Sequence, residues 1–456
     1  MTLAQRLALL KSKLPAGGSL FDTGTQPADG TVAAVAQPPA PFIPLNDRLQ
    51  RLQRLQHLSG TGGGSRIAAG RPGRSRLDDP EADTEVARRL RGEVIAPGVI
   101  QVDQTISLAS RHGRMAFSAL SGISFAGLGL PEAAPLEGLL FLDTETTGLA
   151  GGTGTLPFMV CLARIRGDNL QVGQWVLTGF AGEGAMLRTI FEWIGPAEHL
   201  VTYNGKSFDV PLLATRYRLA RQPDPFAGKN DAGRDNPKGH VDLLHLTRRA
   251  CGHGWDDCRL QTAERRLLGF FREDDFPSHL IPQAWADFVR NGGVEPLQAI
   301  AEHNRHDVLS LAALLGMLAA MYAEPGHESA NSLKIAQAHA ARGNIAHAID
   351  HLTGAWGMLD EAALLFLAKL YRNQRRDEQA IAIWMRLRED RCIAAIETLA
   401  KYHEHVAYDP AIALVFAEEL LRLEPGSEIH ARRHARLGQR LGKLKMKLDR
   451  RSGHRG

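Results

Sequence analysis

The hydrophobic pattern between residues 93 and 322 alternates strand-like with helix-like segments. Period-two alternation over 93–108 predicts strands, and apolar runs that end in polar or turn-forming residues predict further strands at 139–145, 156–165, 170–180 and 199–205. Helical periodicity is found at 184–194, 208–220 and 299–322. Strands first, with helices interspersed later, predict an α/β domain with a mixed sheet.

After residue 328 the apolar positions follow a helical period throughout. Ala336, Ala368 and Ala400 recur at intervals of 32 residues, and Ala348 and Ala380 repeat the same step. Small residues at such an interval are typical of stacked helix pairs. We expect an all-α domain of tetratricopeptide-like repeats that binds a protein partner, with a plain helical cap on the first domain as the alternative.

The first 85 residues differ in composition from the rest. Residues 15–45 are rich in Pro, Gly, Ala and Thr and show no sustained period, which is typical of disordered linkers. The predicted organisation is a disordered, flexible N-terminal region over 1–85, a globular domain over 86–326, a helical domain over 327–430 and a basic C-terminal tail over 431–456.

The formal net charge of +4 conceals an uneven distribution. Residues 1–80 carry ten Lys/Arg and five Asp, and residues 432–456 carry ten Lys/Arg and one Asp, which leaves 34 basic and 44 acidic residues in the body. Basic ends attract phosphate backbones, and they also occur as solubilising tails. An acidic body suits a protein whose carboxylates bind metal.

Cysteine usage indicates a reducing compartment, so we expect a cytoplasmic protein. The four cysteines, at irregular spacing, form no disulfide pattern. Cys251 and Cys258 lie near His245 and His253, but without the C-x-x-C spacing typical of zinc sites. No apolar run approaches the roughly 20 residues of a membrane helix, and we expect no membrane partner.

Two acids follow the apolar run 139–142, with Thr144 between them. Residues two apart in a strand share a face, so Asp143 and Glu145 are expected side by side at the edge of the core. Unpaired like charges are costly there, and a cation between them would offset that cost. The structural alternative is a strand that ends in a solvated turn.

Two further acids are predicted at helix positions. Asp209 opens a helix after a strand, where Asp commonly serves as an N-cap. Asp307 lies four residues after His303, so both project from one helix face, unless the pair is a surface contact or His306 is the partner. Four carboxylates supply the hard oxygen ligands that Mg²⁺ or Mn²⁺ prefer, and two such ions can activate water for phosphodiester cleavage.

Three short motifs resemble those of a known family. DTET at 143–146, NGKSFD at 204–209 and HNRHD at 303–307 are similar to the three exonuclease motifs of the DEDD superfamily of 3′-to-5′ exonucleases. With FLDTETTGLAGGTGT and HVDLLHL, the chain resembles the bacterial YprB-like ribonuclease-H-like proteins, which often carry tetratricopeptide-like helices. The resemblance implies a ribonuclease-H-like domain and two divalent metal ions held by Asp143, Glu145, Asp209 and Asp307.

The resemblance includes one departure, at the general base. The histidine subclass has its base five residues before the last Asp, where this chain has Glu302. The tyrosine subclass has a Tyr four residues before it, where this chain has His303. The helical-face argument favours His303 as the residue that activates water, with His306 as the alternative.

Weaker candidates lie in or beside the motifs. Asn204, Lys206 and Thr146 are candidates for substrate binding. Asp242 is expected to cap a helix rather than to enter the site. Backbone N–H groups of 151–155 are candidates for phosphate contact, and Arg216 and Arg218 for contact with a nucleic-acid backbone, although a tight turn and surface solvation explain these features equally well.

The sequence therefore predicts a metal-dependent 3′-to-5′ exonuclease acting on single-stranded DNA or RNA. The alternative is a non-catalytic adaptor, in which the nuclease fold binds nucleic acid and the repeats and basic tail recruit partners. The intact carboxylate set favours the enzyme, whereas the unusual histidine spacing favours the adaptor.

Overall fold

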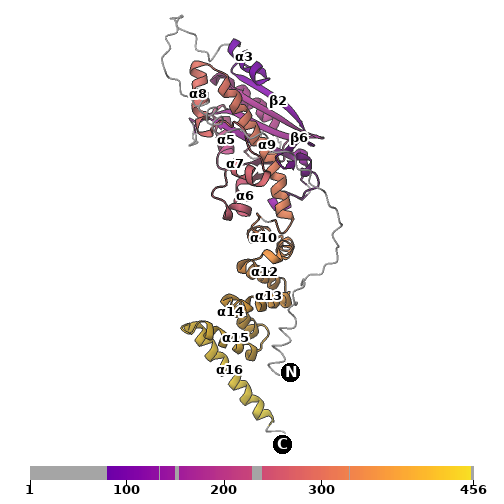
Figure 1. Ribbon diagram of the computed structural model, residues 1–456, viewed down its shortest axis with the longest axis vertical. Coiled ribbons are helices and arrows are strands. Elements are labelled where there is room, and N and C mark those ends of the chain that lie inside the picture. Colours follow the sequence, from indigo (N-terminus) through magenta and orange to yellow (C-terminus); the bar gives the residue numbers. More distant parts are fainter. Residues whose placement is uncertain (1–79, 133, 149–153, 228–238, 328, 453–456) are drawn as a thin grey trace. The chain divides into compact units, whose positions relative to one another are not determined.

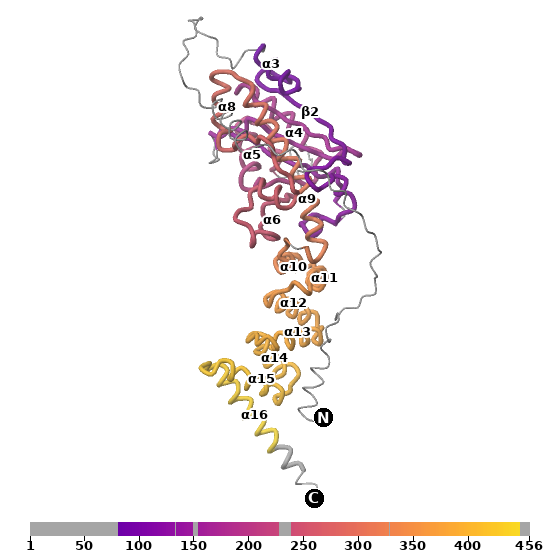
Figure 2. The backbone as a smooth tube through the Cα atoms, viewed as in Figure 1, coloured from indigo at the N-terminus to yellow at the C-terminus, as the bar shows by residue number. Residues whose placement is uncertain are grey.

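The computed structural model describes residues 80–132, 134–148, 154–227, 239–327 and 329–452. These residues form two compact units that divide between Glu324 and Pro325 (Figures 1 and 2). The first unit contains a mixed seven-stranded sheet with helices, and the second contains helices alone. The predicted fold class is confirmed for both units. The predicted disorder of the N-terminal region concerns residues 1–79, which lie outside the described residues.

A single mixed sheet forms the framework of the first unit. Its strand order is β1-β2-β7-β6-β5-β8-β9, in which β5, β8 and β9 run parallel and the neighbours from β1 to β5 pair antiparallel. The strands are β1 (Glu93–Ala96), β2 (Val99–Ser107), β5 (Leu139–Thr146), β6 (Pro157–Arg166), β7 (Asn169–Leu177), β8 (His199–Thr202) and β9 (Gly239–Asp242). A separate hairpin joins β3 (Arg111–His112) to β4 (Met115–Ala116).

Helices cover both faces of this sheet. On β7, Gly173 and Trp175 contact Trp193 of α4 (Glu183–Ile194), whereas Gln174 between them donates to the Ala301 carbonyl of α9 (Glu295–Ala323). Successive strand residues point to opposite faces, so α4 and α9 lie on opposite sides of the sheet. Further helices of this unit are α5 (Asp209–Leu219), α6 (Leu243–Cys251), α7 (Leu260–Ala263), which continues as the π-helical turn η7 (Glu264–Leu268), and α8 (Ile281–Asn291).

The unit begins earlier than the sequence predicts. Residues 80–85, predicted as flexible, form the first half of α3 (Pro80–Leu90). The reason is the Asp83 carboxylate, which accepts from the Gly98 N–H at 2.8 Å and from the Thr178 hydroxyl. Asp83 therefore ties the helix to the β1–β2 turn and to the end of β7, so these residues belong to the domain.

The longest helix of the first unit is α9, which runs across the sheet in Figure 1 and contacts β5, β6, β7 and β8. Its length and apolar composition would allow it to span a membrane, but 72% of the most apolar stretch is buried within the structure. Such burial is also found in the central helix of a globular domain.

The second unit consists of successive helices that pack against their neighbours along the chain. They are α10 (Ser332–Ala341), α11 (Ile345–Gly354), α12 (Glu361–Asn373), α13 (Asp377–Glu389), α14 (Ile393–His405), α15 (Pro410–Leu423) and α16 (Glu428–Ser452). The alanines that recur at 32-residue intervals, from Ala336 to Ala400, are completely buried between these helices. Small side chains at these positions allow close approach of paired helices, whereas the assignment to tetratricopeptide repeats stays a prediction.

The basic C-terminal run is helical for most of its length. Residues 428–452 form α16, which starts before the predicted tail boundary of 431. Leu437 of α16 is buried against Ala413 and Ala417 of α15, and this contact holds the first part of the helix on the unit.

Candidate active site

The site is built at the carboxyl end of β5, between the antiparallel neighbour β6 and the parallel neighbour β8. Asp143 and Glu145 share the sheet face that α9 covers. The Asp143 Oδ2 accepts a 2.7 Å hydrogen bond from Asn304 Nδ2 of that helix. Thr144, between the two acids, donates from Oγ1 to Asp209 Oδ1 at 2.5 Å. Asp143 is hydrogen-bonded to a packed helix and the Glu145 side chain is only 14% exposed, so the solvated-turn alternative is wrong.

Asp209 is buried at the first position of α5. The N-cap of that helix is Phe208, without a side-chain cap hydrogen bond, so Asp209 does not serve as the cap. Instead Asp242 organises the preceding loop: its carboxylate accepts from the N–H groups of Asn204 at 2.8 Å and Lys206 at 3.1 Å, and from Leu244 N–H as the cap of α6. This confirms the structural role expected for Asp242.

His303 and Asp307 lie one turn apart on α9 and face Glu145. His303 Nε2 is 3.6 Å from Glu145 Oε1 and 3.6 Å from Asp307 Oδ2. Among the described residues, these three form the one group of candidate metal ligands whose ligand atoms all lie within 4.8 Å of one another. The His303 side chain is 5% exposed, so the surface-contact alternative is wrong. His306 packs instead beside Phe270, with 5.5 Å between ring centroids.

Crowding of the carboxylates changes their protonation. Burial, and then the charges of Asp307, Asp209 and Glu145, hold the pKa of Asp143 well above its ordinary range. Burial and the charges of Asp307 and Asp209 raise the pKa of Glu145 to about 8, against the opposing effect of His303, and burial raises that of Asp209 to about 6.

This electrostatic state fits a cation site. Burial and mutual repulsion raise the pKa values of Asp143, Glu145 and Asp209, and a bound cation would offset the cost of their charged forms. Hard divalent ions prefer oxygen ligands of this kind. The compact ligand group contains Glu145, His303 and Asp307, while Asp143 and Asp209 belong to the same charge group but lie outside that compact set.

Two residues that the sequence analysis missed contact the His303 side chain. Asp275 Oδ1 lies 2.6 Å from His303 Nδ1. Arg272 Nη1 lies 3.2 Å from the same nitrogen and 3.6 Å from Asp275 Oδ1. The shorter contact assigns the Nδ1 hydrogen to a bond with Asp275, so that Nε2 faces Glu145 and Asp307. Burial would lower the pKa of His303, but Asp307, Asp275 and Glu145 together raise it to about 9.

Arg272 also links the site to a buried polar network. Its Nη2 donates to Asp307 Oδ1 and, at 2.6 Å, to Glu264 Oε1 at the start of the π-helical turn η7. Ser310 of α9 donates to the same Glu264 oxygen at 2.5 Å. Arg272 therefore fixes Oδ1 of Asp307, while Oδ2 of the same carboxylate lies toward His303 Nε2.

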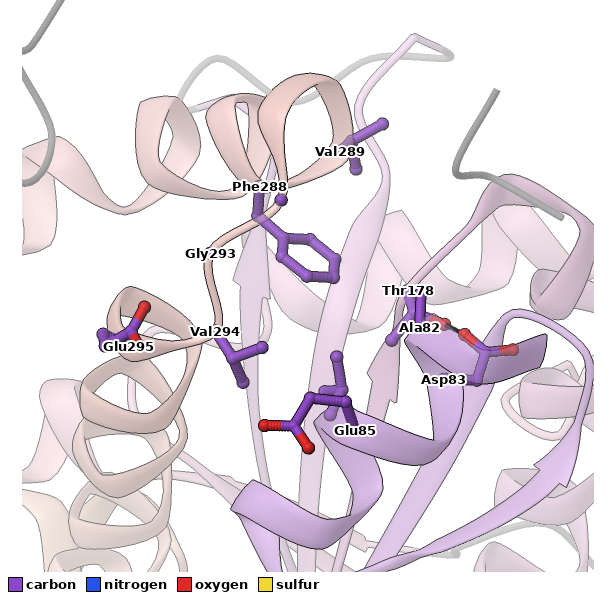
Figure 3. Close-up of a pocket in the computed structure, with 11 residues that line it drawn as sticks. Ala82, Asp83, Glu85, Thr178, Phe288, Val289, Gly293, Val294 and Glu295 are labelled. Carbon is purple, nitrogen blue, oxygen red and sulfur yellow. Dashed lines mark hydrogen bonds between the residues drawn. The ribbon is translucent and has the colours of Figure 1, made fainter. Parts of the chain in front are cut away.

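The site opens into a cavity of about 780 Å³. Its lining includes His303, Asp307, Arg272, Asp275, Arg259 and Leu260. A different cavity, of about 380 Å³, lies between α3 and the α8–α9 junction (Figure 3). Figure 3 shows Asp83 beside Thr178 there, in the hydrogen bond that holds α3 to the sheet. No carboxylate of the metal-ligand set lines this second cavity, so the chemistry belongs to the first.

The weaker candidates have varied surroundings. Asn204 and Lys206 are exposed beside the site, whereas Thr146 is buried and donates to the Gly148 carbonyl at 2.9 Å. Their roles in substrate binding stay predictions. Arg216 pairs with Glu183 at 2.5 Å and Arg218 with Asp224 at 3.3 Å. Of the stretch 151–155, residues 151–153 lie outside the described residues.

The cysteines form no metal site among the described residues. Cys251 is buried and Cys258 is half-buried, and neither belongs, with His245 or His253, to a compact group of three candidate ligands. All four cysteines are free thiols in the structure.

Comparison with known proteins identifies the family. A model of the RNase H superfamily matches residues 140–319, the segment from β5 to near the end of α9. An uncharacterized protein, YprB of Bacillus subtilis (strain 168), is 32% identical over 359 residues, which covers 75% of this chain and 84% of the relative. A family B DNA polymerase from the hyperthermophilic archaeon Pyrobaculum calidifontis is similar at 14% identity and a TM-score of 0.32, over 56% of this chain and 35% of the polymerase. The chain belongs to the YprB family, and its residues 140–319 contain an RNase H superfamily domain.

Proposed function

We propose that this protein is a metal-dependent 3′-to-5′ exonuclease that hydrolyses phosphodiester bonds in single-stranded DNA or RNA. Membership of the RNase H superfamily indicates a nuclease that processes nucleic acid. The observation that supports the finer proposal is the group of Glu145, His303 and Asp307, whose ligand atoms lie within 4.8 Å of one another beside the buried Asp143 and Asp209.

In this proposal Asp143, Glu145, Asp209 and Asp307 hold two divalent ions, Mg²⁺ or Mn²⁺. When bound, such ions stabilise negative charge on the reacting phosphate and lower the pKa of water. The carboxylates contribute position: Asn304 fixes Asp143 and Thr144 fixes Asp209, so both acids are oriented before the substrate arrives.

His303 is proposed as the general base. Its Nδ1 hydrogen bonds to Asp275, so its Nε2 faces the acids and is available to accept a proton from water. Once the charges of Glu145 and Asp307 are neutralised, the pKa of His303 falls from about 9 toward its ordinary value, because those charges raise it. Asp275 acts through His303 as a positioning residue.

The proposed direction of hydrolysis rests on the three motifs that resemble the DEDD exonucleases. The test uses 3′- and 5′-labelled single-stranded DNA and RNA, incubated with Mn²⁺ or with EDTA. We expect metal-dependent shortening from the 3′ end by the wild type and none by Asp209→Ala. Intact strands with the wild type in Mn²⁺ would contradict the enzyme.

The adaptor is the second candidate function, and Arg272 is the observation that favours it. Arg272 donates to Asp307 and so supplies a positive charge that partly replaces a cation. Metal binding separates the two functions. An active carboxylate site should give a rise in thermal stability with Mn²⁺ that Asp143→Ala removes, whereas an adaptor with an inactive site should give no such rise.

We further propose that the helical unit binds a protein partner and that α16 contacts a nucleic-acid backbone. Exposed Arg440, Lys443 and Lys445 support the second part, while Arg433 and Arg436 are paired with Glu397 and Glu404. Reversing the charge of the three exposed residues should weaken binding of a labelled oligonucleotide at low salt.

A further inference from the structure

A further cavity, here called the Trp255 cavity, adjoins the active-site cavity. It has a volume of about 730 Å³ and shares Arg259 and Leu260 with the cavity that contains His303 and Asp307. Its lining includes Asn204 from the loop before α5, Arg248 from α6, and Trp255. A path along the surface therefore leads from the reactive carboxylates past Arg259 to an aromatic ring.

Trp255 is suited to contact a flat ligand. It is half-buried in the loop after α6, and the guanidinium of Arg266 lies 5.6 Å from the centre of its ring. An indole that lines a cavity offers a stacking surface for a nucleic-acid base, since every base has a π-face. In a duplex the base faces are already stacked on their neighbours, so such a surface selects unpaired bases.

Charge distinguishes this side of the site from the other. Two exposed arginines, Arg248 and Arg259, line the Trp255 cavity together with two acids, Asp256 and Asp257. Two further exposed basic residues are Lys206, two positions after Asn204, and Arg266, beside the Trp255 ring. Asp257 is engaged within its own loop, accepting from Arg259 N–H at 2.9 Å and from the Thr262 hydroxyl at 2.6 Å.

A different part of the active-site cavity adjoins an aromatic ring among acids. A cavity of about 390 Å³ there shares Arg272 and Asp275 with the active-site cavity, and Phe271 in its lining is 66% exposed. Asp274 also lines it, and Glu273 is exposed between the two. An aromatic ring is thus present on both sides. Acids outnumber basic residues in the lining of the Phe271 cavity, whereas the two are equal in number in the lining of the Trp255 cavity.

We propose that the Trp255 cavity binds the body of a single-stranded nucleic acid whose end lies at the carboxylates, with a base stacked on Trp255 and a phosphate held by Arg259. The inference rests on the proposed nuclease function and adds the side on which the strand runs. Arg248 and Asn204 lie along the same path, and Phe271 is not part of it.

The test measures binding without hydrolysis. Full-length protein in EDTA is titrated against fluorescent dT and rU 12-mers and against a 12-bp DNA duplex, by anisotropy. We expect Trp255→Ala to weaken binding of the single strands about 5- to 100-fold, and Trp255→Phe to retain most of the affinity. Phe271→Ala, the matched aromatic control on the acidic side, should bind like the wild type. The dT and rU arms report whether DNA or RNA binds more tightly.

Two further readouts separate direct contact from a structural effect. Arg259→Gln should reduce the slope of log Kd against log salt by about 0.7, and Arg265→Gln, on the Phe271 side, should leave it unchanged. Binding should quench tryptophan fluorescence in the wild type and quench it less in Trp255→Phe, although that variant still binds.

The outcomes are distinct from those of the hydrolysis test. If the wild type does not bind single strands, if Trp255→Ala and Arg259→Gln bind like the wild type, or if Phe271→Ala weakens binding equally, the proposed path is wrong. If single strands bind through Trp255 but are not cleaved with Mn²⁺, the path stands and the exonuclease function fails.

Discussion

Replacing Glu145 with Gln should stabilise the metal-free protein at neutral pH. Its pKa is raised from 4.5 to about 8, so between those values the folded state binds a proton that the unfolded state releases. Stability therefore falls as the pH rises through this window. Each pH unit contributes about 1.4 kcal/mol, which gives about 3 kcal/mol at pH 7 and less than about 1 kcal/mol at pH 5. Gln resembles the protonated form and avoids this cost.

Urea unfolding in EDTA at pH 7 and pH 5 measures this difference. In thermal unfolding at pH 7, the same gain in free energy of unfolding for Glu145→Gln corresponds to a rise in Tm of about 6 to 12 °C for a domain of this size. Glu302→Gln is the matched control, because Glu302 lies on the same helix as His303 with its side chain 60% exposed. The reasoning fails if Glu145→Gln is no more stable than the wild type at pH 7, or if its gain is equal at both pH values.

Three other perturbations test the structure more briefly. Asp275→Ala should lower kcat for oligonucleotide hydrolysis about 10- to 100-fold with little change in KM. Asp275→Asn retains an acceptor for His303 and should keep most of the wild-type kcat. An equal loss of kcat in the two variants would contradict the positioning role. Asp242→Ala leaves three backbone N–H groups without their acceptor and should lower the free energy of unfolding in urea by about 2 to 4 kcal/mol, so an unchanged midpoint would contradict its structural role. Burial lowers the pKa of His112 from 6.5 to about 3, so between these pH values the unfolded state binds a proton that the folded state does not. Stability therefore falls as the pH drops below 6.5, by about 2 kcal/mol at pH 5. His112→Gln should remove this part of the pH dependence of the free energy of unfolding in urea.

The strands and acids that follow strong periodicity could be predicted from the sequence. The run 139–142 is completely buried, and Asp143 and Glu145 share a face as alternation requires. The four-residue spacing also places His303 on the helix face of Asp307, toward the acids, whereas His306 projects from a different face and packs beside Phe270.

Other parts of the site depend on long-range contacts that a local pattern does not encode. Arg272 and Asp275 lie in the segment FREDDF, which has the composition of a solvated surface loop, yet the Arg272 side chain is only 5% exposed. It is buried because α9 packs beside the π-helical turn and brings Asp307 to this loop, where Arg272 contacts both Asp307 and Glu264 of that turn. The strand β9 has only four residues and follows a polar stretch of sequence, so its formation likewise depends on pairing with β8.

Asn304 lies within the motif HNRHD, and its role in holding an acid could be predicted from the sequence. An uncharged amide beside a histidine on a buried helix face needs partners, and here it accepts from Gln174 at 2.9 Å and donates to Asp143. A polar residue on the buried face of α9 therefore indicates a neighbouring polar group in the domain.

The position of His303 and Asp307 within α9 affects local unfolding of the site. His303 and Asp307 lie near the amino end of a helix whose later turns, from Val308 to Tyr322, are largely buried in the domain. Opening those two positions to solvent would disturb contacts with the sheet and with η7, so local fraying should be rare. Amide hydrogens of α9 near the site should therefore exchange with solvent at rates close to those of the central strands, which means that this half of the site forms and melts with the domain as one cooperative unit.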